Sequence, residues 1–409
     1  MNTPTASEHL LKSLDQCVVC GLCIPHCPTY PISQREGDSP RGRIALMQGL
    51  ISDKLGDAEH ATDAIDRCVG CRACETVCPA KVPYGAALAE FRLIGPSRKP
   101  KAGMGERLAK SMRRHPLAMR AVGIAARLAL RIPNRRFKSS RLGRLARYAA
   151  GPLRKVKAPQ EPVTSQGPKG SVVLFPGCVV PAMAPATVTA AQTLLNRLGY
   201  GVVMPQRTTC CGALSLSEGD LPGMTRNLGA VDKLAADHPD SPIVSLAAGC
   251  SSQVKLYPSI LPLTDAPLAW TTRFTDFMVF VEQALAATDC RFVKSDLKVA
   301  VHEPCSLRHG LKQGAITENV LKVIPGIKLT ALPRSAPCCG AGGSTLLSHP
   351  EIADPLAQNT VDALLALAPD VIVSANIGCA MHLQAELRRR GSAIAVVHPV
   401  EILADALSD

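Results

Sequence analysis

The sequence contains few aromatic residues and no long uninterrupted apolar segment. Phe, Trp and Tyr make up 3% of its 409 residues, so we do not expect the stacking surface of a protein that binds single-stranded nucleic acids. The longest uncharged stretch, 171–196, is interrupted by four Pro and Gly residues, which argues against a transmembrane helix. The first 16 residues lack the apolar core of a secretory signal peptide. We therefore predict a cytoplasmic protein with no membrane-spanning segment and no nucleic-acid partner.

Cysteine, in contrast, is abundant. The chain has 17 cysteines, an odd number, so they cannot all pair in disulfides, and without export the expected role of their thiolates is metal binding. Eight cysteines precede residue 96, none lies between 96 and 165, and nine follow residue 170. This distribution predicts that the chain is divided into four parts, which are residues 1–95, 96–169, 170–290 and 291–409.

Two segments near the N-terminus share one cysteine spacing. CVVCGLCIPHCP (17–28) and CVGCRACETVCP (68–79) both read C-x2-C-x2-C-x3-C-P, the ligand run of bacterial ferredoxins with [4Fe–4S] clusters. Structural zinc sites, the alternative, usually have two C-x2-C pairs separated by a longer gap. Because the fourth cysteine of such a run reaches the other cluster in two-cluster ferredoxins, we predict two crossed ligand sets. The first set is Cys17, Cys20, Cys23 and Cys78, and the second is Cys68, Cys71, Cys74 and Cys27.

The segment between the two runs has a helical pattern. It includes SPRGRIALMQGLISDKL (39–55), and the 40 residues between the runs make a longer gap than in the smallest ferredoxins. Together with CPTY (27–30), this segment resembles the α-helical ferredoxin domain of dehydrogenase iron–sulfur subunits. The resemblance implies an α-helical fold for residues 1–95.

Beyond residue 170, short apolar segments alternate with helical stretches. Six of these segments each lead to a cysteine, and they are SVVLF, GVVMP, PIVSLAAG, LKVAVHEP, IKLTALP and PDVIVSANIG. The alternation predicts a tandem α/β repeat with mainly parallel sheets. Open α/β sheets bind ligands outside the carboxyl ends of their strands, so the cysteines lie at the expected binding edge.

The cysteines of this region form two matching sets of four. The first cysteine and the paired cysteines are separated by 31 residues in one set and 32 in the other, and 38 and 39 residues follow before the last cysteine. The sets are Cys178, Cys210, Cys211 and Cys250, then Cys305, Cys338, Cys339 and Cys379. They resemble the cysteine-rich domain of heterodisulfide reductases, in which each set continues as C-x2-C and binds an iron–sulfur cluster.

The last cysteine of that pattern is missing from both sets. Gln253 and His382 occupy that position. The four remaining cysteines of each set leave the kind of metal site open: a cubane, one cluster or none. We predict a further iron–sulfur cluster in at least one repeat. We expect His382 on a helix surface, although it is a candidate ligand. His302 and His398 lie near strand ends, and we expect them to support neighbouring ligands or the fold rather than to bind metal themselves. Glycines follow both cysteine pairs, and they let the backbone turn sharply there: Gly212 and Gly340.

Residues 96–160 form a basic segment. They contain 19 Lys and Arg but one acidic residue, in a chain of net charge +13, so the rest of the chain is mildly acidic. Apolar residues recur three and four positions apart between the arginines, which predicts amphipathic helices that serve as a linker or dock on a partner or a membrane. We expect docking on flavin subunits or on the membrane face. Charge reversal of four arginines should release that complex: Arg113, Arg114, Arg135 and Arg136.

Three segments of the second repeat extend the resemblance. With CCGAGGS (338–344), VIVSANIGCAMHL (371–383) and HPVEIL (398–403), nearly the whole chain resembles the iron–sulfur subunit of glycolate oxidase. The resemblance implies that separate flavin subunits, which alone carry FAD, oxidise glycolate, and that this subunit passes electrons through two [4Fe–4S] clusters to a membrane acceptor such as quinone. It also implies a peripheral position on the inner face of the cell membrane.

Related complexes supply the alternatives to this function. The third subunit of anaerobic glycerol-3-phosphate dehydrogenase and the lactate-utilisation proteins share parts of the arrangement, and a heterodisulfide-reductase-like subunit would itself act on disulfides or thiols. The sequence contains no convincing flavin or nicotinamide site. We therefore expect an oxidoreductase subunit that does not itself catalyse hydride transfer.

Overall fold

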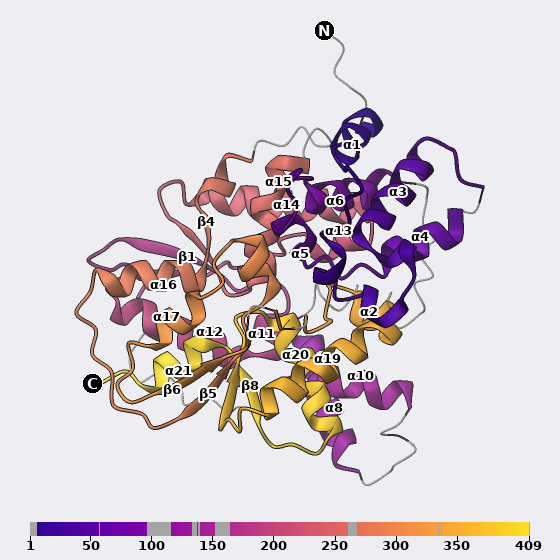
Figure 1. Cartoon of the computed structure of the whole chain (residues 1–409). Helices are drawn as coiled ribbons and strands as arrows, with labels where there is room; N and C mark the ends of the chain where they lie inside the picture. Colours follow the sequence, from indigo (N-terminus) through magenta and orange to yellow (C-terminus); the bar gives the residue numbers. More distant parts are fainter. Residues whose placement is uncertain are drawn as a thin grey trace.

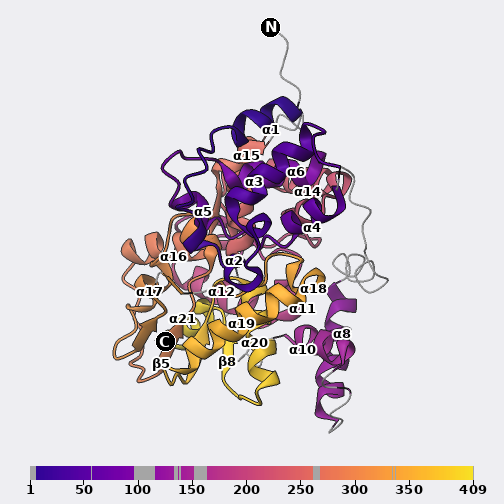
Figure 2. The ribbon, with the colours of Figure 1, turned by 45° about the vertical axis from the view of Figure 1, so that its right-hand side comes forward.

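The computed structural model describes most of the chain. The described residues are 6–56, 58–95, 116–132, 137, 140–151, 164–260, 268–333, 335–336 and 338–408. A helical region at the N-terminus lies against two α/β repeats, and the second repeat lies below it in both views (Figures 1 and 2). None of the helices within these ranges has the length and apolar character needed to cross a bilayer.

The N-terminal region is built from four longer helices joined by cysteine-bearing loops. The longer helices are α1 (Ala6–Leu14), α3 (Pro40–Ile51), α4 (Ala58–Asp66) and α6 (Tyr84–Ile94), and the short ones are η1 (Ile24–His26), α2 (Tyr30–Ser33), η2 (Glu36–Asp38) and α5 (Ala73–Thr76). Ser39 begins α3 because its side chain accepts a hydrogen bond from the Gly42 amide. Leu14, Met47 and Ile65, each fully buried, join three of the helices in one apolar core. The predicted helix within 39–55 is therefore confirmed.

Repeat 1 is a four-stranded parallel sheet of order β2-β1-β3-β4. Its strands are β1 (Ser171–Phe175), β2 (Gly201–Val203), β3 (Ile243–Ser245) and β4 (Phe274–Asp276). Its helices are α11 (Val180–Met183), α12 (Pro185–Arg197), α13 (Ala213–Ser217), α14 (Leu221–Asp237), α15 (Ala248–Ile260), η4 (Ala269–Thr272) and α16 (Phe277–Ala286).

Repeat 2 has the same topology, with the order β6-β5-β7-β8 and all strands parallel. Its strands are β5 (Lys298–Val301), β6 (Lys328–Ala331), β7 (Val371–Val373) and β8 (Ala395–Val397). Its helices are η5 (Ser306–Gly310), α17 (Ile316–Leu321), α18 (Thr345–Ser348), α19 (Pro350–Leu365), α20 (Ile377–Arg389) and α21 (Pro399–Asp405). The prediction of a helical ferredoxin region followed by a tandem, parallel α/β fold is confirmed.

The two repeats share one hydrophobic core. Alternate residues of a strand face opposite sides of its sheet, so Val172 and Leu174 of β1 face a core that also receives Val299 and Val301 of β5. The opposite face of the first sheet packs with α6 of the N-terminal region, and the opposite face of the second packs with α19 and α20. The repeats are thus fused back to back, and the N-terminal region covers the outer side of repeat 1.

The described part of the basic segment consists chiefly of two helices, α8 (Pro116–Arg131) and α10 (Arg141–Ala149). Met119 of α8 packs against Met183 of repeat 1. Arg388 of repeat 2 donates to the Arg147 carbonyl oxygen of α10 at 3.0 Å, so the two helices bridge the repeats (Figure 2). The four arginines chosen for charge reversal lie outside the described residues: Arg113, Arg114, Arg135 and Arg136.

Candidate functional site

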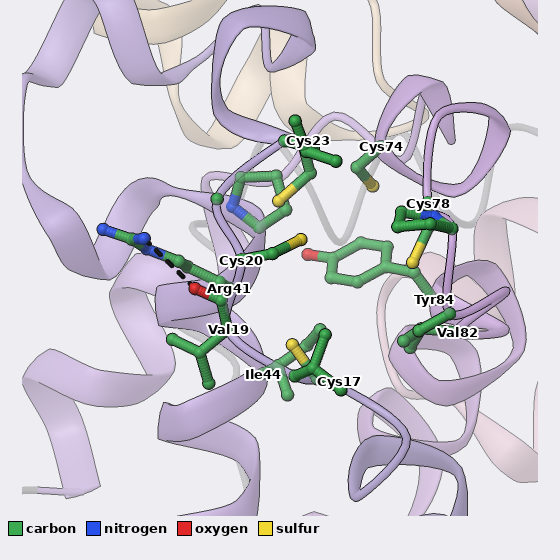
Figure 3. A pocket seen from close by; sticks show the side chains of 16 residues that line it. Cys17, Val19, Cys20, Cys23, Arg41, Ile44, Cys74, Cys78, Val82 and Tyr84 are labelled. Atoms are coloured by element: carbon green, nitrogen blue, oxygen red, sulfur yellow. Dashed lines mark hydrogen bonds between the residues drawn. The ribbon is translucent and has the colours of Figure 1, made fainter.

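Five cysteines of the N-terminal region line one cavity. Their sulfur atoms surround a space beside the Tyr84 ring (Figure 3), and they are Cys17, Cys20, Cys23, Cys74 and Cys78. The cavity contains about 450 Å³ of empty space, part of it open to solvent. Its members come from both cysteine runs, because Cys74 and Cys78 belong to the second run.

The loop that carries the first three cysteines curls tightly around this cavity. Val19 and Gly21 adopt positive φ angles of 56° and 81°, a conformation that turns the chain between successive cysteines. Arg41 of α3 fixes the loop, because its guanidinium donates to the Val19 carbonyl oxygen at 3.4 Å. Cys20 is exposed at the tip of the loop, so this cavity lies at the protein surface.

A second set of cysteines, more buried than the first, lines the neighbouring cavity, which contains about 280 Å³ of empty space, part of it open to solvent. Its cysteines are Cys27, Cys68, Cys71 and Cys74. Cys74 and Tyr84 line both cavities, so the two spaces are direct neighbours. Each cavity thus receives three cysteines of one run together with the last cysteine of the other, and the first cavity also receives Cys74.

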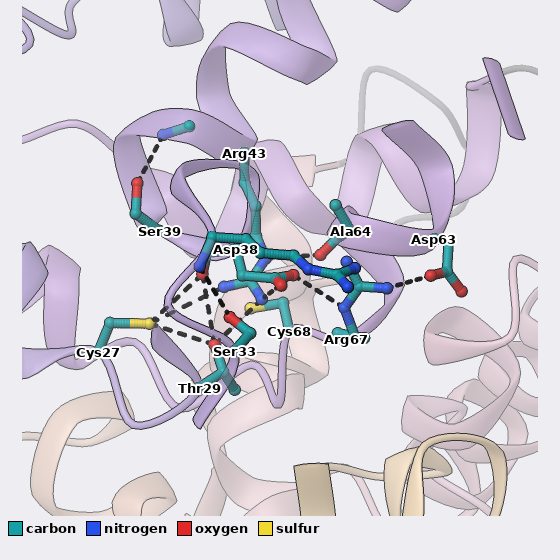
Figure 4. Close-up of polar contacts among 12 residues, drawn as sticks. Cys27, Thr29, Ser33, Asp38, Ser39, Arg43, Asp63, Ala64, Arg67 and Cys68 are labelled. Atoms are coloured by element: carbon teal, nitrogen blue, oxygen red, sulfur yellow. Dashed lines mark hydrogen bonds and ion pairs between the residues drawn. The ribbon is translucent and has the colours of Figure 1, made fainter. Parts of the chain in front are cut away.

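Arg43 supplies a buried positive charge beside the second cavity (Figure 4). Its guanidinium donates to the Cys27 sulfur at 3.8 Å and to the Thr29 hydroxyl at 3.0 Å. It also lies 3.4 Å from the carboxylate of Asp38, which accepts a further bond from Arg67 at 2.9 Å. A buried charge is tolerated only when it is paired and hydrogen-bonded, and this network meets that requirement.

The same charges act on the thiol of Cys68. Burial alone would raise its pKa, but the guanidinium groups of Arg43 and Arg92, together with hydrogen bonds from Tyr84 and the Gly70 backbone, outweigh burial and lower the pKa below the ordinary value. The Tyr84 hydroxyl also donates to the Cys68 sulfur at 3.5 Å. Positive charge and hydrogen-bond donors near the sulfur stabilise a thiolate, which is the form that binds metal.

These residues fit a pair of [4Fe–4S] clusters. Such clusters are held by four cysteine thiolates each, and hydrogen bonds to the sulfurs tune them. The region offers eight thiols around two adjacent cavities, with Arg43 and Tyr84 as donors to sulfur.

In repeat 2, two cysteines and a histidine lie together at the carboxyl ends of the strands. One ring nitrogen of His302 and the sulfurs of Cys339 and Cys379 all lie within 4.8 Å of one another, and all three residues are buried. The two sulfurs are 2.7 Å apart. Burial lowers the pKa of His302 to about 4, so its imidazole is neutral at physiological pH. The expectation that His302 supports neighbouring ligands or the fold, rather than binding metal itself, stays a prediction.

Repeat 1 also brings three of its four cysteines together. The thiols of Cys210 and Cys250 bond to that of Cys211 and, together with burial, raise its pKa. Three residues before Cys178, the position that His302 takes before Cys305, stands Phe175. The Phe175 ring packs edge-on against Phe274, with centroids 5.2 Å apart.

The glycine after each cysteine pair has the expected backbone geometry. Gly212 and Gly340 have φ angles of 84° and 76°, which a residue with a Cβ adopts only at a cost. A Cβ at Gly340 would also lie 2.5 Å from the Ala353 carbonyl oxygen. The predicted sharp turn after both pairs is confirmed.

His382 and His398 contact residues other than the cysteines. His382 is buried rather than on the helix surface where we expected it, because α10 covers α20 at this point. Its ring packs edge-on against Tyr148, with centroids 5.4 Å apart. The structural role predicted for His398 is confirmed, since its Nδ1 accepts a bond from the Val400 amide and caps α21.

The second repeat's cysteines also lie beside the ferredoxin cysteines. Cys71 and Cys338 pack against the same apolar cluster, which contains Val69, Ile352 and Leu356. Burial raises the pKa of Cys71, and the charge of a nearby Cys338 thiolate raises it further. The Thr76 hydroxyl and the His309 Nδ1 share a hydrogen bond of 3.0 Å across the same contact. The second cavity is therefore the one that adjoins repeat 2.

Comparison with known proteins gives the same domain pattern. A 4Fe-4S dicluster domain matches residues 13–82, and a cysteine-rich domain matches residues 172–255 and again 299–384. The glycolate oxidase iron–sulfur subunit of Escherichia coli is 33% identical over 96% of this chain and 94% of that protein.

More distant relatives differ in activity. One subunit of the dihydromethanophenazine:CoB–CoM heterodisulfide reductase of Methanosarcina barkeri is 25% identical over 100% of this chain and 97% of that protein. Lactate utilization protein A of Macrococcus caseolyticus is 25% identical, over 57% of this chain and 95% of that protein. The chain belongs to the family of iron–sulfur oxidoreductase subunits that combine a 4Fe-4S dicluster domain with two cysteine-rich domains, and this family includes the glycolate oxidase iron–sulfur subunit.

Proposed function

We propose that this chain is the electron-transfer subunit of a glycolate dehydrogenase complex, in which flavin subunits oxidise the 2-hydroxyacid and a membrane acceptor such as quinone receives the electrons. The observation that carries the proposal is the pair of adjacent cavities, each lined by thiols from both cysteine runs. The 33% identity to the glycolate oxidase subunit supports the choice of glycolate.

The two ligand sets follow the cavities. Cys17, Cys20, Cys23 and Cys78 would hold the first [4Fe–4S] cluster, and Cys68, Cys71, Cys74 and Cys27 the second. When bound, each cluster accepts and donates one electron. The chain's own residues fix the sulfurs and place Arg43 beside Cys27, where its charge offsets that of the thiolates.

The loop around the first cavity provides a docking edge for the flavin subunit. Val18, Val19 and Leu22 are 69%, 63% and 57% exposed, and they surround the exposed Cys20. Apolar side chains gathered on a surface mark protein contacts. A partner seated here would bring its flavin next to the outer cavity.

Helix α8 offers a separate surface that suits an anionic membrane. Leu117, Ile124 and Leu128 are exposed and lie on one side of the helix. Arg120 and Arg131 share that side, and a helix with exposed aliphatic residues and arginines binds the interface of anionic lipids. We assign this face to the membrane that contains the acceptor.

An anaerobic preparation tests the electron-transfer role. The purified chain should contain about eight irons, capture flavin subunits from its native host and become reduced when glycolate is added to the assembled complex. Val18→Asp with Leu22→Asp should abolish capture. Because both residues also line the first cavity, iron is measured on the same sample, and the comparison is made on protein that keeps about eight irons. Val293→Asp changes a similarly exposed valine outside the N-terminal region and is the matched control. Zinc in place of iron, or glycolate-independent reduction, would disprove the proposal.

The related activities are separate outcomes of the same preparation. Reduction by lactate or glycerol-3-phosphate, with none by glycolate, would assign the chain to a related dehydrogenase. Thiol–disulfide turnover by the chain without flavin subunits would assign it to a heterodisulfide-reductase-like catalyst. The membrane-facing side of α8 is tested with Ile124→Glu combined with Leu128→Glu. This variant should reduce co-sedimentation with anionic vesicles about tenfold and still capture the flavin subunits. Loss of capture with unchanged co-sedimentation would mean that this side of α8 binds the flavin subunit instead of the membrane.

A further inference from the structure

The two sheets differ at the edge where β2 and β6 are the outermost strands. In repeat 1 the chain itself covers this edge, because the Val202 amide of β2 donates to the Thr164 carbonyl oxygen at 2.8 Å. Asn196 fixes Thr164, since its Oδ1 accepts a hydrogen bond from the Thr164 amide at 3.2 Å. The Ser171 hydroxyl holds the next residue, because it donates to the Ser165 carbonyl oxygen at 2.8 Å. This segment therefore closes the edge of the first sheet.

The corresponding edge of repeat 2 is open. The Lys328 amide of β6 donates to the Leu297 carbonyl oxygen, on the side of β5, at 3.0 Å. Successive residues of a strand direct their main-chain groups to opposite sides, so the amides of Leu329 and Ala331 point away from β5. Within the described ranges, no main-chain carbonyl oxygen accepts a hydrogen bond from either amide. Leu329, the second residue of β6, is the counterpart of Val202, the second residue of β2.

The open edge is positively charged. Lys298 of β5 and Lys328 of β6 are direct partners in the strand register, and both are exposed. Lys294 lies close by, because a Cβ on Gly326 would lie 3.1 Å from its Cε. The Asp370 carboxylate accepts from the Lys298 amide, but none of the three lysines forms an ion pair with a residue that the structure describes. Like charges directly opposite each other destabilise a sheet, so an anionic partner would relieve this repulsion.

We propose that β6 binds an extended acidic segment of a partner protein, which adds a strand to the second sheet. Strand addition to an open edge is a common mode of peptide recognition, in which main-chain hydrogen bonds provide affinity and alternate side chains provide specificity. Leu329 and Ala331 supply the main-chain groups, and Lys298 and Lys328 pair with acidic side chains. The site goes beyond the proposed electron-transfer function and does not depend on which hydroxyacid the complex oxidises.

A second copy of this chain fits the edge less well than an acidic segment does. Two β6 strands side by side would bring two sets of these lysines together, and lysines on edge strands discourage such pairing. Strand β6 lies beside the C-terminus, at the end of the molecule away from the N-terminal region (Figure 1). A partner on β6 therefore leaves the loop of residues 18–22 free for the flavin subunit.

Peptide binding by the full chain tests the site. The probe is a capped synthetic peptide of alternating Glu and Thr, and a second peptide has Lys in place of Glu. The Glu peptide should bind saturably and more weakly at high salt, and at saturation it should slow hydrogen exchange of the Leu329 and Ala331 amides about tenfold. The Val202 amide is the internal reference, because its bond to Thr164 should protect it with or without peptide.

Variants separate the main-chain contribution from the charge. Ala331→Pro removes an outward amide without breaking a hydrogen bond to β5 and should weaken binding at least about tenfold. Ala331→Ser keeps the amide and should bind like wild type. Lys298→Glu with Lys328→Glu should reverse the preference, so that the Lys peptide binds better. Arg226→Glu with Lys233→Glu changes two exposed charges on α14 of repeat 1, and as the matched control it should leave the preference unchanged.

Several outcomes would overturn the proposal. These are no saturable binding, equal binding of the two peptides, or unchanged binding by Ala331→Pro. A concentration-dependent dimer that Ala331→Pro dissociates would also overturn it, because the edge would then pair with a second copy. Iron content and flavin-subunit capture are measured on the same variants, which should keep about eight irons. Misfolding and failure of the electron-transfer function are thereby distinguished from failure of this site.

Discussion

Repeat 1 and repeat 2 place different side chains around the same cysteines. Phe175 in the first corresponds to His302 in the second, and both are buried at the end of the strand that leads to the first cysteine. Phe175 packs against Phe274, whereas His302 faces two thiols. One scaffold thus uses the same position for core packing in one copy and for polar chemistry in the other.

The difference extends along the neighbouring strand. Ser245 and Ser374 correspond, but only Ser374 has a histidine to bond. Two residues further on, Ala247 of repeat 1 corresponds to Asn376, which donates to the Cys379 sulfur. The repeats have therefore diverged around their cysteines while keeping one topology. Repeat 1 is covered by α6 of the N-terminal region, and repeat 2 places His302 beside two thiols.

The largest expected effect comes from truncating the aromatic position of repeat 1. Phe175→Ala should destabilise the protein by about 3–5 kcal/mol, because a fully buried Phe side chain is removed from a packed core. His302→Ala removes a smaller side chain, and we expect a loss of about 1–2 kcal/mol in metal-free protein. Urea unfolding can be followed by the fluorescence of Trp270, the single tryptophan. The centroid of its ring lies 6.0 Å from that of Phe274. Equal losses of unfolding free energy in Phe175→Ala and His302→Ala would contradict the difference between the repeats.

The contrast between Phe175 and His302 shows which features of the site can be predicted from the sequence and which cannot. The alternation of apolar and helical segments predicted both sheets, because it is a local property of the sequence. The spacing of the cysteines predicted which thiols lie close together, because the same spacing occurs twice in the chain. The role of His302 depends on a contact between the end of β5 and residues 37 and 77 positions later, which spacing does not encode. His382 was misplaced for the same reason, because only the path of the basic segment shows that α10 covers it. Comparing the repeats residue by residue would have pointed to His302.

The residues that cap the helix after the last strand of each repeat should differ in how their contribution to stability depends on pH, and this effect is of intermediate size. Asp276 caps α16 in repeat 1, and His398 caps α21 in repeat 2. Burial raises the pKa of Asp276 to about 7 and lowers that of His398 to about 3. Folded Asp276 therefore binds a proton that the unfolded chain releases above its ordinary pKa of about 4, whereas folded His398 lacks a proton that the unfolded chain binds below about 6.5.

Between about pH 4.5 and 6.5 these two linkages oppose each other. The Asp276 contribution to stability is present at low pH and is lost as pH rises towards 7, while the His398 contribution is present at high pH and is lost as pH falls towards 3. Asp276→Asn keeps a capping side chain and should make stability rise with pH by up to about 1.4 kcal/mol per pH unit relative to wild type. His398→Asn should make it fall by a similar amount. Urea midpoints at several pH values test this, and parallel pH profiles for all three proteins would contradict it.

The smallest expected effect concerns the position where both repeats lack a cysteine. The buried Nε2 of Gln253 in repeat 1 has no hydrogen-bond partner among the residues that the structure describes, and such a group costs stability. Gln253→Met should therefore be neutral or stabilise the protein by up to about 1 kcal/mol. In repeat 2, the Nδ1 of His382 is likewise buried without a partner among the described residues. His382→Met should nevertheless destabilise the protein by about 1 kcal/mol, because it removes the edge-on contact with Tyr148 and the 3.7 Å approach of Nε2 to the Asp354 carboxylate. Thermal unfolding of the two variants compares them directly. If Gln253→Met lost as much stability as His382→Met, the glutamine would have a role equivalent to that of the histidine. The two repeats would then be more alike at this position than their contacts indicate.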